Sequence, residues 1–86
     1  MAGQLSSLKK IAQVFLSLKT ESQMTDFLKG LFTPQELEQL PIRLEIVKRL
    51  KQGQSQRQIA QDLKIGIATV TRGALEIKKG RFKNVK

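Results

Sequence analysis

An all-α fold is predicted for this 86-residue chain by three features of its sequence. Apolar residues recur at intervals of three and four along most of the chain, as on one face of a helix, and no strand-like alternation occurs. Two segments, 33–36 and 55–58, have the capping residues with which helices begin. Between residues 55 and 73, a small residue, a turn and an aliphatic residue follow at the offsets of a helix-turn-helix.

The first predicted helix, over residues 5–18, is apolar over an arc broader than one stripe. Its apolar residues are Leu5, Leu8, Ile11, Ala12, Val14, Phe15, Leu16 and Leu18. A helix of this kind needs cover on more than one side. Because a chain this short has a small core and this one has no cysteine for a disulfide, we expect a second subunit to supply the cover in a homodimer.

A second helix is predicted from one apolar face, which we interpret as core and not as a ligand site. The residues of this face are Met24, Phe27, Leu28, Leu31 and Phe32. A third helix should begin in TPQE, where Thr33 can cap, Pro34 suits the first turn and Glu36 can complete a capping box.

The inner face of this third helix is predicted to consist of Leu37, Leu40, Leu44, Val47 and Leu50, and Gly53 should end the helix. Pro41 removes one backbone donor and its ring clashes with the carbonyl group of Leu37. We therefore expect a kink or a short break at Pro41, with the same apolar face continuing beyond it.

A pair of short helices is predicted in SQRQIAQDLKIGIATVTRG. The spacing of Ser55 and Gln58 places a helix start at Gln56. The inward residues of the pair are expected to be Ile59, Ala60, Leu63, Ile65 and Val70, with the turn at residues 64–66 and the second helix starting near Ile67. Lys64 in a left-handed conformation would cost about 1 kcal/mol.

The second helix of this pair has small side chains at its start, which suits entry into the major groove of DNA. Ala68 permits close approach, whereas Ile67 and the threonine methyl groups can meet thymine methyl groups. The hydroxyl groups of Thr69 and Thr71 can serve bases or bridging waters, unless these are ordinary surface residues. The basic side chains expected to hold phosphates are Arg57, Arg72, Lys78 and Lys79.

The positive charge is concentrated in the second half of the chain. Residues 1–42 hold four Lys and four Asp or Glu, whereas residues 43–86 hold twelve Lys or Arg and three Asp or Glu, which accounts for the net charge of +9. This asymmetry indicates a polyanionic partner, with nucleic acid favoured over an anionic membrane surface.

We expect one domain over residues 1–86, comprising a helical dimerisation core at 1–53, the helix-turn-helix at 55–78 and a basic tail at 79–86 that is too polar to form a helix. No apolar run approaches the roughly 20 residues of a membrane span. The N-terminus also lacks the order of regions found in a signal peptide. The sequence therefore predicts a soluble cytoplasmic protein with no membrane partner.

The segment LFTPQELEQLPIRLEIVKRLKQGQSQRQIAQDLKIGIATVTRG resembles the tryptophan repressor family, most specifically in SQR and GIATVTRG. The likeness covers residues 31–78. It implies an intertwined all-helical homodimer that binds double-stranded operator DNA as a transcriptional repressor, with L-tryptophan as corepressor. The DNA contacts that the resemblance implies are Gln56, Arg57, Ile67, Ala68, Thr69 and Thr71.

The resemblance also implies a tryptophan pocket at Thr33, Arg43, Arg72 and Gly73. Arg72 can bind the ligand carboxylate, and the indole ring suits a slot between the guanidinium planes of Arg43 and Arg72. Gly73 would leave room for the ring. Taken singly, Arg43 could be a surface residue and Gly73 a packing contact.

The sequence departs from the family at several positions. Glu76 stands where the family commonly has a serine near the ligand amine, so it could pair with the ammonium group or repel the carboxylate. Pro41 is close to Arg43, Ala60 replaces a DNA-contacting lysine, and the last helix of the family is expected to be shortened or absent.

Two other functions are weighed against a tryptophan-dependent repressor. The first is a ligand-independent helix-turn-helix regulator, and the second is a basic module that binds a membrane surface or a protein partner. The basic residues surround the helix-turn-helix and do not lie opposite one apolar stripe, which argues against the membrane module. An enzyme or a metal site is not expected, because the chain has no histidine, no cysteine and no glycine-rich phosphate loop.

Overall fold

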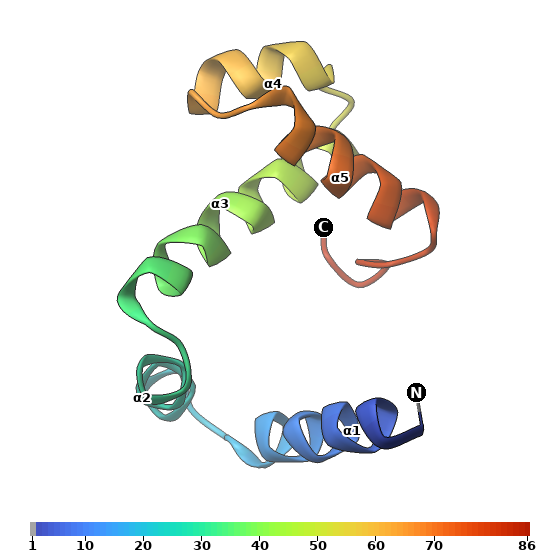
Figure 1. Ribbon diagram of the computed structural model, residues 1–86. Helices are drawn as coiled ribbons and strands as arrows, with labels where there is room; N and C mark the ends of the chain where they lie inside the picture. Colours follow the sequence, from blue (N-terminus) through green and yellow to red (C-terminus); the bar gives the residue numbers. More distant parts are fainter. Residues whose placement is uncertain (1) are drawn as a thin grey trace. The chain divides into compact units, whose positions relative to one another are not determined.

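The computed structural model describes residues 2–86, with side chains from residue 7 onward, and in this part of the chain it contains five helices and no strand (Figure 1). The helices are α1 (Ala2–Ser17), α2 (Glu21–Leu31), α3 (Pro34–Lys51), α4 (Gln56–Leu63) and α5 (Ile67–Lys78). The predicted all-α class is therefore confirmed. No helix of the described residues is long and apolar enough to cross a membrane.

The chain divides into two compact units, which we call the N-terminal unit (Met1–Leu37) and the C-terminal unit (Glu38–Lys86). The division falls within α3, whose first turn belongs to the N-terminal unit. Residues 79–86 form turns and no helix, as expected of the tail. The prediction of a single domain stays a prediction.

Side-chain caps start α2 and α3 in the N-terminal unit. Thr20 Oγ1 accepts from the Gln23 N–H group at 3.0 Å, which starts α2. At the start of α3, the Thr33 N–H group donates to Glu36 Oε1 at 2.9 Å and the Glu36 N–H group donates to Thr33 Oγ1 at 3.2 Å. The predicted capping box is thus complete. The pKa of the Glu36 carboxyl group is lowered, first by its hydrogen bond from the Thr33 backbone and then by a hydrogen bond with the Thr33 side chain.

The apolar side chains of the N-terminal unit stay largely uncovered within one chain. Phe15 of α1 and Phe27 of α2 meet edge to face with ring centroids 5.3 Å apart, but no residue of α2 is buried. Leu16 is 84% exposed, and Leu8, Ile11 and Val14 are also exposed. Two members of the predicted faces, Leu18 and Phe32, lie just beyond the C-terminal ends of α1 and α2. The side chain of Leu5 lies outside the described ones.

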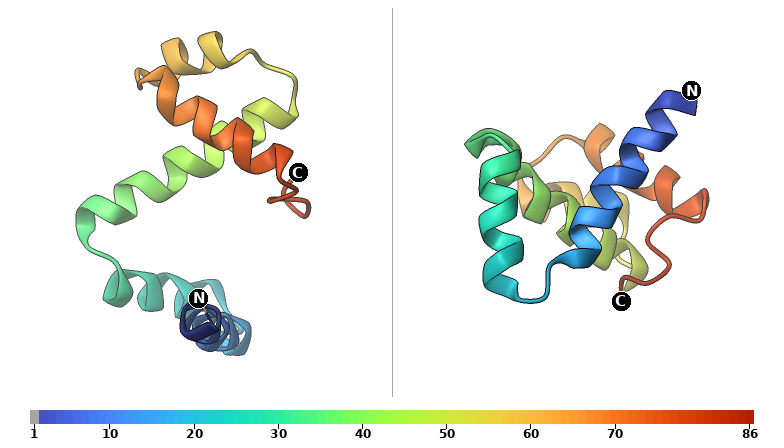
Figure 2. Two further views of the ribbon diagram at one scale, coloured as in Figure 1. Left: turned by 45° about the vertical axis from the view of Figure 1, so that its right-hand side comes forward. Right: turned by 90° about the horizontal axis from the view of Figure 1, so that it is seen from below.

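The C-terminal unit has a core of its own. Ile46, Ile59 and Val70, from α3, α4 and α5, are fully buried and form one cluster. The residues packed against this cluster are Ile42, Leu50, Ala60, Leu63 and Ile65. Figure 1 and the left-hand view of Figure 2 show α5 crossing the C-terminal half of α3. The predicted inward residues of the helix pair are confirmed.

The inner face predicted for α3 was wrong in part. Leu44 is 43% exposed, whereas Ile46, which the predicted face omitted, is 1% exposed. The reason is that α3 packs against the helix pair through an apolar row spaced four residues apart, Ile42, Ile46 and Leu50, of which the predicted face included only Leu50. Two apolar rows on one helix cannot be ranked by spacing alone.

Of the kink or short break expected at Pro41, the break is absent: α3 is continuous from Pro34 to Lys51. Pro41 is exposed, so its ring lies on an open side of the helix and not in the core. The missing N–H group costs the helix one hydrogen bond, which is not enough to end a helix with apolar contacts on the far side of the proline.

Three helices end in the same motif, with a residue of positive φ. In each, two backbone N–H groups bond back to carbonyl groups five and three residues earlier, which is the Schellman pattern. The residue of positive φ is Gly53 after α3 (φ 92°) and Gly80 after α5 (φ 96°). After α4 it is the non-glycine residue Lys64 (φ 56°). The left-handed conformation considered for Lys64 is confirmed.

Candidate nucleic-acid interface and ligand cavity

The start of α5 presents small side chains to solvent. Ile67 is 51% exposed, and Ala68 and Thr69 are exposed as well, whereas Val70 behind them is fully buried. Gly66 caps the helix with no side-chain hydrogen bond. The first turn of α5 is therefore anchored by one aliphatic residue and open on its outer side.

Two side chains that the sequence predicts to contact DNA are bonded to each other. Thr71 Oγ1 lies 2.8 Å from Gln56 Oε1 and 3.0 Å from the carbonyl oxygen of Ile67. Thr71 is half-buried. This contact joins the first residue of α4 to the second turn of α5, so it ties the two helices together near their N-terminal ends.

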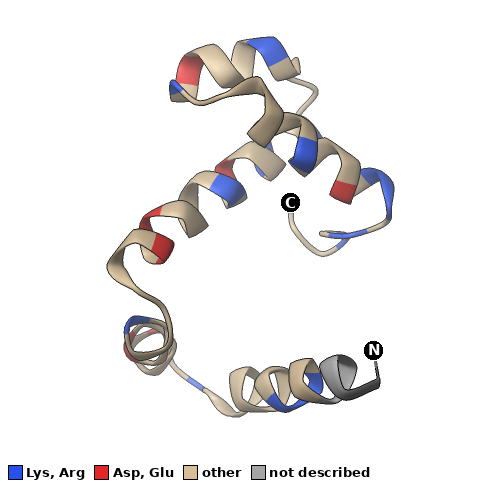
Figure 3. Ribbon diagram, viewed as in Figure 1, with Lys and Arg blue, Asp and Glu red and all other residues tan. Residues whose placement is uncertain are grey.

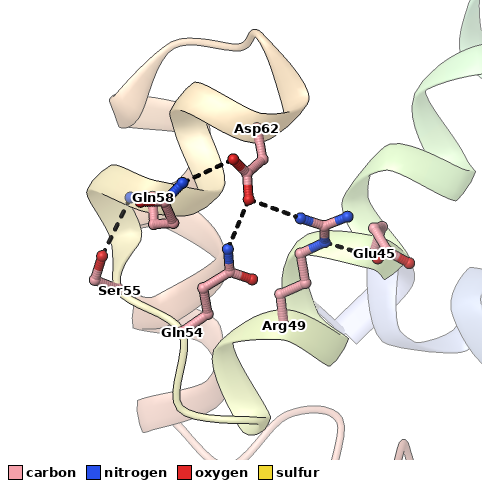
Figure 4. Close-up of polar contacts among 6 residues, drawn as sticks. All are labelled: Glu45, Arg49, Gln54, Ser55, Gln58 and Asp62. Atoms are coloured by element: carbon pink, nitrogen blue, oxygen red, sulfur yellow. Dashed lines mark hydrogen bonds and ion pairs between the residues drawn. The ribbon is translucent and has the colours of Figure 1, made fainter.

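Ser55 starts α4 as predicted, since its Oγ accepts from the Gln58 N–H group at 3.2 Å. The side chain of Gln58 does not return to Ser55 and instead donates to Asp62 Oδ1 at 2.8 Å. Asp62 Oδ2 also accepts from Gln54 at 2.9 Å and from Arg49 at 3.3 Å (Figure 4).

Arg49 extends this network to α3, because its Nε donates to Glu45 Oε2 at 2.8 Å. Asp62 of α4 is thus joined to the last turns of α3 through one guanidinium group. The sequence did not reveal this network, in which directly bonded side chains are separated by up to 13 positions. The network holds α4 at a fixed angle on α3, and so fixes the orientation of α4 and α5 relative to α3.

Basic side chains surround the helix pair. Lys and Arg occur on α4, on α5 and in the segment that follows α5 (Figure 3). Arg57, Arg72 and Lys78 are exposed. Lys79 is also exposed, and its Nζ lies 3.6 Å from Glu76 Oε1. All four predicted phosphate contacts are therefore accessible to a polyanion.

A cavity of about 580 Å³ lies between α3, α5 and the tail of the C-terminal unit. It brings together four of the five predicted ligand residues: Arg43, Arg72, Gly73 and Glu76. The other residues of its lining are Ile46, Val47, Ala68, Thr69, Arg81 and Phe82. Thr33, the fifth predicted ligand residue, belongs to the N-terminal unit and forms the capping box of α3.

Gly73 lets α5 approach α3 closely. A Cβ atom at this position would lie 3.1 Å from Ile46 Cγ2 and 3.7 Å from Leu50 Cδ1. Ile46 is in the buried cluster and has little freedom to move. Gly73 is therefore a helix-packing position as well as part of the cavity lining.

Arg81 and Phe82 are cavity residues that the sequence did not predict. Arg81 Nε lies 3.4 Å from Glu76 Oε2. The signals for this arrangement are Gly80, which suits the end of a helix, and a single aromatic residue in an otherwise polar tail. With Arg43 and Arg72, Arg81 gives the lining three guanidinium groups against the single carboxylate of Glu76.

The family model described as Trp repressor protein matches residues 6–84. The chain belongs to the Trp repressor family. This is a family of DNA-binding transcriptional repressors and not of enzymes, so the predicted function class is confirmed. Tryptophan is the corepressor ligand of the family, and its members bind operator DNA as dimers.

Similar proteins share the name Trp operon repressor homolog. One from Vibrio campbellii is 42% identical over 71 residues, which cover 81% of this chain and 71% of that protein. One from Vibrio cholerae is 51% identical over 59 residues, or 67% of this chain and 57% of that protein. One from Aliivibrio fischeri is 36% identical over 78 residues, which cover 90% of this chain and 72% of that protein. No solved structure matches the chain significantly.

Proposed function

We propose that this member of the Trp repressor family is a homodimer that binds a symmetric DNA operator through α4 and α5, with L-tryptophan as its corepressor. The small, exposed side chains at the start of α5 allow its backbone to approach base edges. Arg57, Lys78 and Lys79 supply phosphate contacts around it.

The cavity has the chemistry that an aromatic carboxylate requires. Its volume of about 580 Å³ is within the range of about 300–1,000 Å³ for small-molecule sites. Arg72 and Arg43 offer planar guanidinium groups that can bind a carboxylate and stack on an aromatic ring. Ile46 and Val47 give the lining an apolar floor.

One observation carries the proposed corepressor role. Ala68 and Thr69 line the cavity, and both are also at the exposed start of α5, where DNA would be read. A ligand in the cavity therefore touches the same turn of α5 that faces DNA. If α5 can pack on α3 at more than one angle, the ligand favours the angle at which it binds more tightly. Operator affinity then changes with ligand, because the angle of α5 decides how well it fits the DNA groove.

Dimerisation is supported by the N-terminal unit. Leu8, Ile11, Val14 and Leu16 of α1 are all exposed in one chain. Contiguous apolar side chains of this kind mark a protein interface. A second copy, with the same face, would cover them in a symmetric assembly.

Operator binding by the full chain tests the proposal. Anisotropy of a labelled symmetric operator at fixed salt should show tighter binding as L-tryptophan is added. Arg43→Ala should abolish this gain, because it removes a guanidinium group from the cavity and none of the predicted DNA contacts. Lys48→Ala, which removes one positive charge from an exposed position of α3 outside the cavity lining, should retain it.

Two measurements separate the proposal from a ligand-independent regulator. If millimolar L-tryptophan leaves operator affinity unchanged and calorimetry detects no binding heat, the corepressor role is wrong and DNA binding without ligand stands. If labelled operator and random DNA bind equally, the reading role of α5 is wrong.

A further inference from the structure

Glu76 is the one acidic side chain in the described cavity lining, and both of its oxygens face a cation. Oε1 lies 3.6 Å from Lys79 Nζ, and Oε2 lies 3.4 Å from Arg81 Nε. Of the two cations, only Arg81 lines the cavity itself. The carboxylate is therefore already engaged before any ligand arrives.

The Schellman motif at the end of α5 places Arg81 over Glu76. The Arg81 N–H group donates to the carbonyl oxygen of Glu76 at 3.0 Å, and the Gly80 N–H group donates to that of Ile77 at 2.9 Å. In many Schellman motifs, the two residues in the positions of Arg81 and Glu76 also make an apolar side-chain contact. Here an ion pair replaces the apolar contact, so Arg81 is held to Glu76 by a backbone hydrogen bond and by its side chain.

The tail after Arg81 is held as well. The ammonium group of Lys51, at the end of α3, donates to the carbonyl oxygens of Phe82 and Val85. Phe82 has a φ of 62°, a left-handed conformation that costs a non-glycine residue about 1–2 kcal/mol. Contacts on both sides of Phe82 thus keep the tail, with Arg81, against the cavity.

An aromatic amino acid brings two charges to this cavity. Its carboxylate can bind Arg43 or Arg72, but its ammonium group has only Glu76 as an anionic partner among the lining residues. To pair with Glu76, the ammonium group must share or displace Arg81. An aromatic acid without an amine meets no such competition.

We propose that Arg81 is a specificity-determining residue that acts through Glu76. Its guanidinium group competes with the ligand ammonium group for the Glu76 carboxylate, and so sets how strongly the site prefers an amino acid over the same aromatic acid without its amine. This inference rests on the proposed function, since it concerns the same cavity.

The test is calorimetry of the full chain with L-tryptophan and with indole-3-propionate, at one pH and salt concentration. The quantity compared is the Kd for indole-3-propionate divided by the Kd for L-tryptophan. Arg81→Gln should raise this ratio about threefold, the effect expected of losing one partly exposed ion pair. Arg81→Lys, which keeps the charge, should leave it near the wild-type value.

Two controls separate competition at Glu76 from a general effect of charge. Lys83→Gln removes the same charge from the same tail, outside the cavity lining, and should leave the ratio unchanged. In a Glu76→Gln background, Arg81→Gln should no longer alter the ratio, because the shared partner is gone. Circular dichroism checks that each variant keeps its helices.

The outcomes are distinct for the two proposals. If both ligands bind but Arg81→Gln leaves the ratio unchanged, or Lys83→Gln raises it equally, the role of Arg81 is wrong and the proposed function stands. If the effect persists without Glu76, Arg81 does not act through it. If wild-type protein binds neither ligand, the proposed corepressor function fails and this inference fails with it.

Discussion

The two compact units of the chain differ in burial and in charge. All of the buried residues among the described side chains, Ile46, Val47, Ile59 and Val70, belong to the C-terminal unit. The N-terminal unit has exposed leucines and, among the side chains described from residue 7 onward, a single aromatic pair between its helices. The N-terminal unit is almost neutral, with four Lys against three Asp or Glu, whereas the C-terminal unit has twelve Lys or Arg against four.

This difference separates two physical tasks. A recognition surface needs a fixed geometry, and the C-terminal unit obtains it from an internal core and from the network around Asp62. An association surface needs apolar area that one chain leaves uncovered, which describes α1. We therefore expect substitutions to act differently in the two units.

The largest effect is expected in the core of the C-terminal unit. Ile59→Ala should lower the free energy of unfolding by about 3 kcal/mol, because Ile59 is fully buried and its truncation leaves a cavity. Ile67→Ala makes the same chemical change at an exposed site and should cost under about 0.5 kcal/mol. Urea unfolding at one protein concentration measures both. Equal losses would contradict the burial contrast.

The next effect concerns α1. Leu16→Ala should weaken dimerisation by about 2 kcal/mol per protomer, since Leu16 is 84% exposed in one chain and would be covered by the partner. Sedimentation equilibrium measures the change, and Gln13→Ala on the same helix is the control.

The same prediction has a thermal form. For the wild type, the midpoint of thermal unfolding should rise with protein concentration, because folding and association are one event. A monomeric mass at micromolar concentration, with helicity retained, would mean that the apolar surface of α1 has another use.

DNA binding should distinguish two positions within the C-terminal unit. Lys79→Ala should weaken binding to operator and to random DNA about equally, by roughly 1 kcal/mol, and lower the salt slope by about one unit. Thr71→Ala should reduce the difference in affinity between operator and random DNA, because it removes one predicted DNA contact and releases a second, Gln56, from its hydrogen bond. Thr71→Ser keeps the hydroxyl group that bonds Gln56 and should retain more of this difference in affinity than Thr71→Ala. A uniform effect of both alanine variants would mean that α5 does not read sequence.

The smallest effect is expected at the turn between α4 and α5. Lys64→Gly should stabilise the protein by about 0.5 kcal/mol, because the relief of left-handed strain exceeds the extra backbone entropy that glycine loses on folding. Lys64→Ala removes the charge but keeps the strained conformation, so it should bring no gain. A gain from alanine equal to that from glycine would point to charge and not to backbone strain. Differential scanning calorimetry measures both variants.

Local features of the fold could be predicted from the sequence. The helix starts at Pro34 and Gln56 and the turn at Lys64 were predicted correctly, since a cap or a turn depends on residues within a few positions of each other. The charge contrast between the two halves is a property of composition. Ile59 and Val70 were predicted to face inward because each helix of the pair has one apolar face.

Tertiary structure decided what depends on contacts between distant residues. Ile46 is buried and Leu44 exposed because α3 packs against the helix pair through the row of Ile42, Ile46 and Leu50. The residues that join Asp62 to Arg49, and Lys51 to the tail, have no local signature. The cavity needs α3, α5 and residues 81–82 together, so Arg81 becomes a partner of Glu76 only once the chain has folded. Spacing along a sequence specifies which side of a helix is apolar, but packing selects the neighbour that each side meets.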